Sequence, residues 1–202
     1  MRIFLASASS RRHLWLKAQP WVESHDIAVV PMNVDESKVM DASNVSSTVE
    51  RVVGLKIESA RMILNENGGE WVGIVSDTMV EDPIRRVPMG KPKDSNQARE
   101  MLTTLSGKSH KVWTCTGILL PRDEENMIYT ESADVHFRDL DADTLDSLVE
   151  SGSWIGKAGG YDIHGRASKL VKVVKGSEIT VLGLSKNSMM ALQEILENNA
   201  TS

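Results

Sequence analysis

The sequence predicts an α/β fold built on a mixed sheet with flanking helices. Stretches with helical apolar spacing alternate with short apolar runs that end in small or polar residues, which is the order of an α/β protein. Two β-rich stretches, 111–120 and 127–137, are separated only by the polar segment PRDEEN and therefore predict an antiparallel hairpin. An antiparallel hairpin beside strands that alternate with helices makes the expected sheet mixed.

The first element is the stretch 3–12, IFLASASSRR, which reads as a strand, a turn of small residues and the start of a helix. This geometry points backbone N–H groups at an anion. Arg11 and Arg12 fall in the first turn of the expected helix, where the helix dipole disfavours a cation by roughly 0.3–1 kcal/mol. A bound anion would reverse that penalty, whereas without one the segment is a strand and a helix with two solvated arginines.

Two carboxylate positions follow expected strands. Asp35 and Glu36 come after a strand over 27–32, although adjacent acids at a strand end are common on any surface. Asp77 follows a short buried strand over 71–75, and polar residues past the carboxyl end of such a strand are where open α/β sheets place their chemistry. A single aspartate there is also a frequent turn former or helix cap.

The stretch 46–65 predicts the clearest helix, with Ser47 and Glu50 at the spacing of a capping box. Lys56 lies on the apolar face of this helix. Its aliphatic stem could carry the ammonium group out to solvent, or the ammonium group could meet a buried anion.

The remaining elements follow the same patterns. Lys91 lies in a loop over 83–92, and the proline after it favours an extended backbone. We expect helices over 94–105, 141–151 and 188–196, and strands over 170–175 and 180–184. The glycine-rich stretch 156–165 lacks the order of a Walker loop.

Composition limits the class of protein. The 202 residues carry a net charge of −5 without a basic block, which disfavours nucleic-acid binding. No stretch approaches the roughly 18 apolar residues of a membrane span, and the apolar start is too short for a secretory signal, so we expect a cytoplasmic protein with one domain over 1–202. The only cysteine, Cys115, is expected to be a buried thiol, and no zinc-ligand spacing occurs.

The charged candidates have complementary chemistry. Four cations, Arg11, Arg12, Lys56 and Lys91, are suited to phosphate groups. Asp77, together with Asp35 or Glu36, could hold Mg²⁺ (or Mn²⁺), which uses one or two carboxylates plus substrate phosphates. The combination indicates a nucleoside triphosphate ligand.

Ordered motifs across nearly the whole chain resemble the Maf family. L-A-S-A-S-S-R-R at 5–12 is similar to its signature L-A-S-x-S-P-R-R. The later matches are S-D-T at 76–78 for its A-D-T, G-K-P at 90–92, S-G-K-S-H-K-V-W-T at 106–114, V-H-F-R at 135–138 and the glycine-rich stretch 156–165.

The resemblance implies a nucleoside triphosphate pyrophosphatase that releases the monophosphate and pyrophosphate. It implies an inosine triphosphatase-like (Maf/Ham1) fold, two lobes around a cleft, and a homodimer. It assigns Asp77 to catalysis, Asp77 and Glu36 to the metal, with Asp35 as a competitor for Glu36, and substrate binding to further positions. Those positions are Ser7, Arg11, Arg12, Lys56, Lys91 and His164.

Departures from the family pattern concern the base more than the reaction. Asp162 and His164 stand where members typically carry glycine and glutamine. Subfamilies acting on dTTP and UTP, and on methylated guanosine triphosphates, both stay open, although the tyrosine-bearing stretch 156–165 favours the pyrimidine type. The alternative is a nucleotide-sensing regulator of cell division with little turnover.

Overall fold

The computed structural model describes residues 1–40, 43–121 and 125–200. Its strands are β1 (Arg2–Ala6), β2 (Ile27–Val29), β3 (Trp71–Glu81), β4 (Pro88–Met89), β5 (Ser109–Leu119), β6 (Met127–Phe137) and β7 (Val171–Lys175). Its α-helices are α1 (Ser10–Lys17), α2 (Val45–Leu64), α3 (Ser95–Leu105), α4 (Ala142–Glu150), α5 (Glu178–Leu182) and α6 (Lys186–Ala200). None of the helices described is long and apolar enough to cross a membrane.

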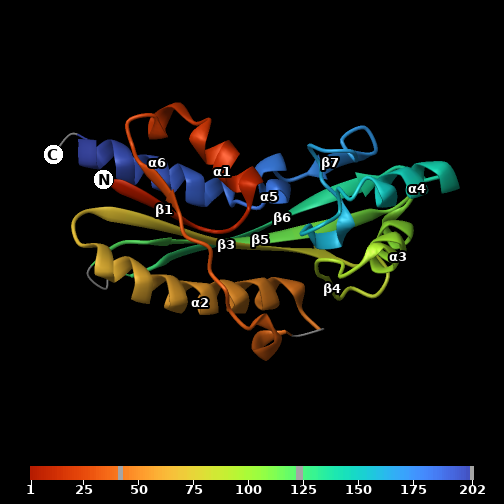
Figure 1. Cartoon of the computed structure of the whole chain (residues 1–202), viewed down its shortest axis with the longest axis horizontal. Helices are drawn as coiled ribbons and strands as arrows, with labels where there is room; N and C mark the ends of the chain where they lie inside the picture. Colours follow the sequence, from red (N-terminus) through yellow and green to blue (C-terminus); the bar gives the residue numbers. More distant parts are fainter. Residues whose placement is uncertain (41–42, 122–124, 201–202) are drawn as a thin grey trace.

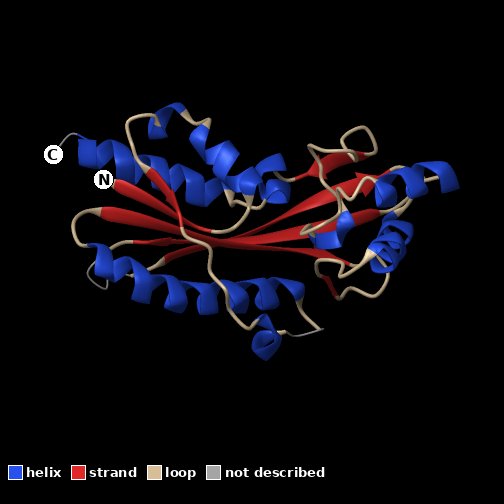
Figure 2. Cartoon of the chain, viewed as in Figure 1, coloured by secondary structure: helices blue, strands red, loops and turns tan. Residues whose placement is uncertain are grey.

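The described strands form one seven-stranded mixed sheet, which confirms the predicted fold class (Figure 2). The strand order is β2-β1-β3-β5-β6-β7, with β4 paired to the far end of β3. β1 runs parallel to β2 and β3, whereas β5 and β6 form the predicted antiparallel hairpin. Residues 122–124 of the connecting segment PRDEEN lie outside the described residues.

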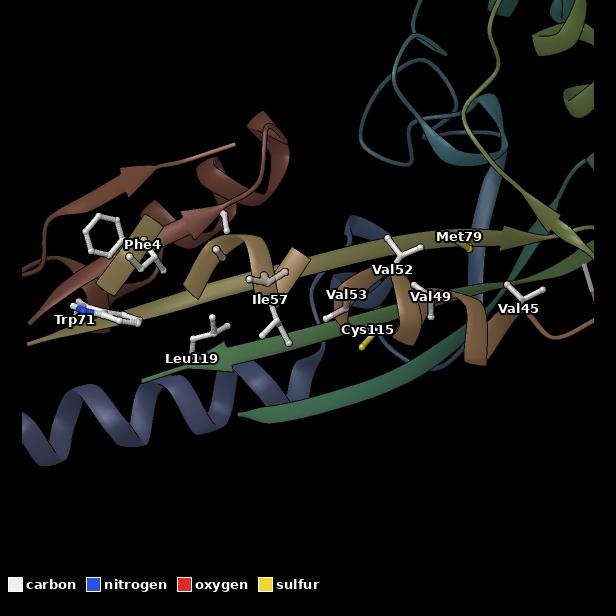
Figure 3. Close-up of a cluster of buried hydrophobic side chains, with 14 residues drawn as sticks. Phe4, Val45, Val49, Val52, Val53, Ile57, Trp71, Met79, Cys115 and Leu119 are labelled. Atoms are coloured by element: carbon white, nitrogen blue, oxygen red, sulfur yellow. The ribbon is translucent and has the colours of Figure 1, made fainter. Parts of the chain in front are cut away.

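Helices cover both faces of the sheet near β1 (Figure 1). One face packs against α2, whose apolar side chains contact β1, β3 and β5 (Figure 3). The residues of α2 in this cluster are Val45, Val49, Val52, Val53, Ile57, Ala60 and Leu64. The opposite face packs against α1 and α6 through a second cluster that includes Leu16 and Leu192. The strands between them are therefore apolar on both faces, and β3 is buried along nearly its whole length.

A third apolar cluster forms at the other end of the long strands. It joins α3 and α4 to the ends of β5 and β6 and to the glycine-rich segment, with Phe137 and Tyr161 among its buried members. The core is thus divided between the two ends of the sheet.

The clearest wrong prediction is the strand over 180–184, which is the short helix α5 followed by Gly183 in a left-handed conformation (φ +114°). The β-branched residues here favoured a strand in sequence. Tertiary contacts decide otherwise, because the backbone carbonyl of Thr180 accepts a hydrogen bond from Thr114 Oγ1 and its hydroxyl contacts Glu131. Both interactions bind α5 to the surface of the sheet.

Two smaller predictions were also wrong. The start of α2 is capped by Asn44, whose side chain accepts from the backbone N–H of Ser47, in place of a Ser47–Glu50 capping box. The strand predicted over 71–75 continues to Glu81, because β5 pairs with it from Gly73 to Val80. Asp77 therefore lies inside a strand and not after one.

Candidate active site

A cleft of about 480 Å³ opens at the carboxyl end of β1. It is lined by the turn between β1 and α1, the middle of β3, the loop after β2, and the glycine-rich segment. The predicted site residues that line it are Ser7, Arg11, Arg12, Glu36, Lys56, Asp77 and Lys91. Residues more than 80 positions apart in sequence thus share one cavity.

The cleft exists because β1 and β3 have different lengths. β1 ends at Ala6, which pairs with Val75, whereas β3 continues for six residues beyond that pair. After Ala6 the chain turns away into α1, so the next part of β3 has no neighbouring strand on this side until β4 pairs with Val80. Open α/β sheets bind ligands at such a crevice beyond a strand's carboxyl end.

Strand alternation directs the side chains of residues 76–78 to opposite faces of the sheet. Asp77 lies on the face of β3 that carries Val75 and Met79, which pack in the cluster beneath α2. Ser76 and Thr78 point to the other face, toward α5 and α1. A continuous strand therefore offers a carboxylate on one side and hydroxyl groups on the other.

Asp77 and Glu36 share the ammonium group of Lys56. Lys56 Nζ lies 2.6 Å from Asp77 Oδ1 and 2.9 Å from Glu36 Oε1. Asp77 and Lys56 are buried, with 7% and 8% of their surface exposed. The sequence left two positions open for Lys56, and the structure places its ammonium group against an anion. The two carboxylates consequently face one point at the floor of the cleft.

The neighbouring acid Asp35 has a structural role at the start of a short helix. Its carboxylate caps the 3-10 helix over Glu36–Val39 and accepts hydrogen bonds from the backbone N–H and the hydroxyl of Ser37. These hydrogen bonds lower the pKa of Asp35. Of the two acids that the sequence could not separate, the structure brings Glu36 into the cleft.

Arg12 is buried and holds the cleft wall together. Its Nη1 donates to Ser7 Oγ at 3.0 Å and to the backbone carbonyl of Ser76 at 2.9 Å, and its Nη2 donates to Thr78 Oγ1 at 2.9 Å. Burial lowers the pKa of Arg12 to about 10, an effect that Asp77 opposes. A side chain at Gly183 would lie 2.7 Å from Arg12 Nε, so glycine is required there. The protein's own acceptors therefore hold this guanidinium in place.

Arg11 and Lys91 are more accessible. Arg11 lines the cleft from the first turn of α1, and its Nη1 lies 3.6 Å from Asp162 Oδ1. Lys91 lines the cleft from the loop after β4 and is exposed. The sequence analysis did not select Lys157, a third accessible cation on the cleft wall, although it lies in the glycine-rich stretch 156–165.

His164 does not line the cleft. Its imidazole Nε2 lies 3.4 Å from Glu178 Oε1, and 48% of its side chain is exposed. Its neighbours Tyr161 and Ile163 occupy the cleft wall instead. Tyr161 is also held by a buried histidine, since its hydroxyl lies 2.9 Å from His110 Nε2. The structure thus gives His110 a hydrogen bond that positions the glycine-rich segment.

Comparison with known proteins identifies the same family that the sequence motifs resemble. The model of the family described as Maf-like protein matches residues 2–196. The chain belongs to the Maf-like protein family.

Curated relatives cover almost the whole Maf-like chain. A protein of Bartonella quintana named dTTP/UTP pyrophosphatase is 34% identical over 95% of this chain and 86% of its own length. A protein of Pyrococcus horikoshii with the same name is 33% identical over 96% of this chain and 97% of its own. A third such relative, from Alkaliphilus oremlandii, is 32% identical over 91% and 90%.

A solved structure shares the fold. A HAM1 protein from Coxiella burnetii matches 98% of the Maf-like chain and 99% of its own with a TM-score of 0.53, at 13% sequence identity. This likeness confirms the expected Maf/Ham1 type of fold.

Proposed function

We propose that this protein is a nucleoside triphosphate pyrophosphatase that hydrolyses dTTP or UTP to the monophosphate and pyrophosphate. The observation that carries the proposal is the Asp77–Lys56–Glu36 cluster at the floor of a cleft lined by further cations. Such a cleft in an acidic chain fits a polyphosphate beside a site that activates water. The pyrimidine preference rests on the names of the relatives.

The residues present fit a divalent cation. Asp77 and Glu36 offer carboxylate oxygens that already face one cationic atom, and oxygen is the donor that Mg²⁺ or Mn²⁺ takes. Among the described residues no three acidic, histidine or cysteine side chains gather into a metal cluster, so phosphate and water oxygens would complete the shell. When bound, such an ion supplies charge neutralisation on the phosphate oxygens.

The protein's own residues account for the rest of the reaction. Asp77 accepts a hydrogen bond from a water molecule and takes its proton as the water oxygen forms a bond to the α-phosphorus. The bond from that phosphorus to the bridging oxygen breaks, and pyrophosphate leaves. Lys56 keeps the Asp77 carboxylate oriented, and Arg12, Arg11 and Lys91 neutralise charge on the phosphate oxygens.

Pyrophosphate release with Mg²⁺ tests the proposal across a panel of canonical and modified nucleoside triphosphates. We expect dTTP and UTP to lead, and Asp77→Asn to reduce turnover by about 10²–10⁴-fold, the range for a positioned acid or base. Asp134→Asn is the matched control, because it removes one negative charge from an ion pair with Lys111 outside the residues that line the cleft.

The results that would overturn the proposal are specific. Wild-type turnover by Asp77→Asn would remove the catalytic assignment, and release of single phosphates would change the reaction class. Tight nucleotide binding without turnover would favour the nucleotide-sensing alternative. The homodimer, the cytoplasmic location and the role of His164 stay predictions.

A further inference from the structure

One carboxylate lies between two of the cleft's accessible cations. Asp162 Oδ1 is 3.6 Å from Arg11 Nη1, and Asp162 Oδ2 is 3.6 Å from Lys157 Nζ. Both cations line the cleft, one from the start of α1 and the other from the glycine-rich segment. Each oxygen of a single side chain therefore neutralises a cation on a different wall.

The local backbone holds this carboxylate in place independently of the two cations. Asp162 Oδ1 accepts a hydrogen bond from the backbone N–H of His164 at 3.1 Å, and the Asp162 carbonyl accepts one from Gly165 at 3.0 Å. A Cβ at Gly165 would lie 3.0 Å from Asp162 Cβ, closer than ordinary contacts. Glycine at 165 thus lets the turn close with the aspartate inside it.

The two ion pairs are of a kind that a ligand can displace. At 3.6 Å both exceed the length of a hydrogen bond, and the side chains of Arg11 and Lys157 are 26% and 22% exposed. Arg12 is the contrast, because it makes three hydrogen bonds of 2.9–3.0 Å to the protein. Phosphate oxygens entering the cleft can take the place of Asp162 on Arg11 and Lys157, whereas they cannot release Arg12.

We propose that Asp162 sets the affinity of the cleft for phosphate: it is an internal anion that occupies Arg11 and Lys157 until the phosphate groups of a ligand displace it. Any phosphate ligand that uses Arg11 and Lys157 must first separate them from the Asp162 carboxylate, and this separation costs the same whatever the ligand. Asp162 thereby weakens the binding of phosphate ligands that reach these two cations. This competition for the two cations does not depend on the proposed function.

A positioning role for Asp162 would make the opposite prediction for phosphate binding. If Asp162 served to hold Arg11 and Lys157 in a productive position, removing its charge would weaken phosphate binding. If it competes with phosphate, removing its charge strengthens binding. The sign of the change separates the two.

The test is calorimetric titration of the full-length protein with pyrophosphate, without nucleotide or divalent metal, for wild type, Asp162→Asn and Asp134→Asn. Asparagine keeps an oxygen that can accept from His164, so this change isolates the charge. We expect Asp162→Asn to bind pyrophosphate about 3- to 10-fold more tightly, because the two ion pairs that it removes are partly exposed and therefore weak. Salt screens such pairs, so the gain in affinity should be smaller at high salt. Asp134→Asn, equal in net charge, should match wild type.

A second variant at the same position keeps the test valid if Asp162→Asn fails to fold. Asp162→Ser also removes the carboxylate and leaves a hydroxyl that can accept in a turn, so it should shift binding in the same direction. Unchanged, undetectable or weaker pyrophosphate binding in variants that unfold at the wild-type temperature would overturn the proposal. Since the titration involves no turnover, tighter binding in a protein inactive on every nucleotide would refute the proposed function and leave this inference standing.

Discussion

Replacing each of the two adjacent arginines by lysine should have very different consequences for stability. Arg12 is buried and donates to Ser7, Ser76 and Thr78, whereas Arg11 makes one ion pair, at 3.6 Å, with the residues that the structure describes, and its side chain is 26% exposed. Lysine keeps the charge but lacks the planar fork that reaches three acceptors at once. Arg12→Lys therefore removes hydrogen bonds from the core of the site, and Arg11→Lys does not.

The magnitude follows from those hydrogen bonds. A hydrogen bond with a charged group contributes roughly 1.5–3 kcal/mol. A lysine at position 12 retains one of the three, and the Thr78 hydroxyl keeps a second partner in Thr114 at 3.0 Å. We expect the free energy of unfolding to fall by about 2–4 kcal/mol, or about 5–10 °C in the unfolding midpoint. Arg11→Lys should stay within about 0.5 kcal/mol of wild type.

Urea unfolding of both variants, followed by circular dichroism and by tryptophan fluorescence, measures these differences. The two probes should give coincident transitions, so that the free energies can be compared. Arg12→Lys within 0.5 kcal/mol of wild type, on the scale that exposed ion pairs set, would refute the reasoning. An equal loss of stability in Arg11→Lys would also refute it, since Arg12 is buried and Arg11 is not.

Three further predictions concern buried groups around the site. Burial lowers the pKa of His110 from 6.5 to about 4, so the unfolded chain binds the extra proton. The free energy of unfolding should therefore drop by about 3 kcal/mol as pH falls from 6.5 to 4; urea unfolding across that range should show a much smaller drop in His110→Gln, and an equal drop would contradict the assignment. Gly183→Ala should cost at least 1–3 kcal/mol, because it strains a φ of +114° and clashes with Arg12; a calorimetric midpoint equal to that of wild type would count against this. Burial raises the pKa of the Cys115 thiol to about 11, so an aromatic disulfide reagent should modify it only after denaturant is added, and rapid labelling of the native protein would argue against burial.

The sequence was informative wherever local patterns decide structure. The apolar face of α2, the hairpin of β5 and β6, and the strand–turn–helix at the start of the chain all follow from short-range spacing. It also identified seven residues that line one cleft, because the order of the motifs and the complementary charges can both be read from the sequence. His164 was the exception, since the direction in which a glycine-rich turn presents its side chains cannot be read from spacing.

The tertiary structure alone decided what each charged residue meets. Sequence patterns treat Arg11 and Arg12 as equals, yet both line the cleft and only Arg12 is buried. They also treat Asp35 and Glu36 as equals, yet only Glu36 enters the cleft and pairs with Lys56. The length of β3 and the helical form of α5 also depend on partners far away in sequence. The physical reason is that burial, strand register and ion pairing are set by long-range contacts, whereas composition and periodicity report only on neighbours along the chain.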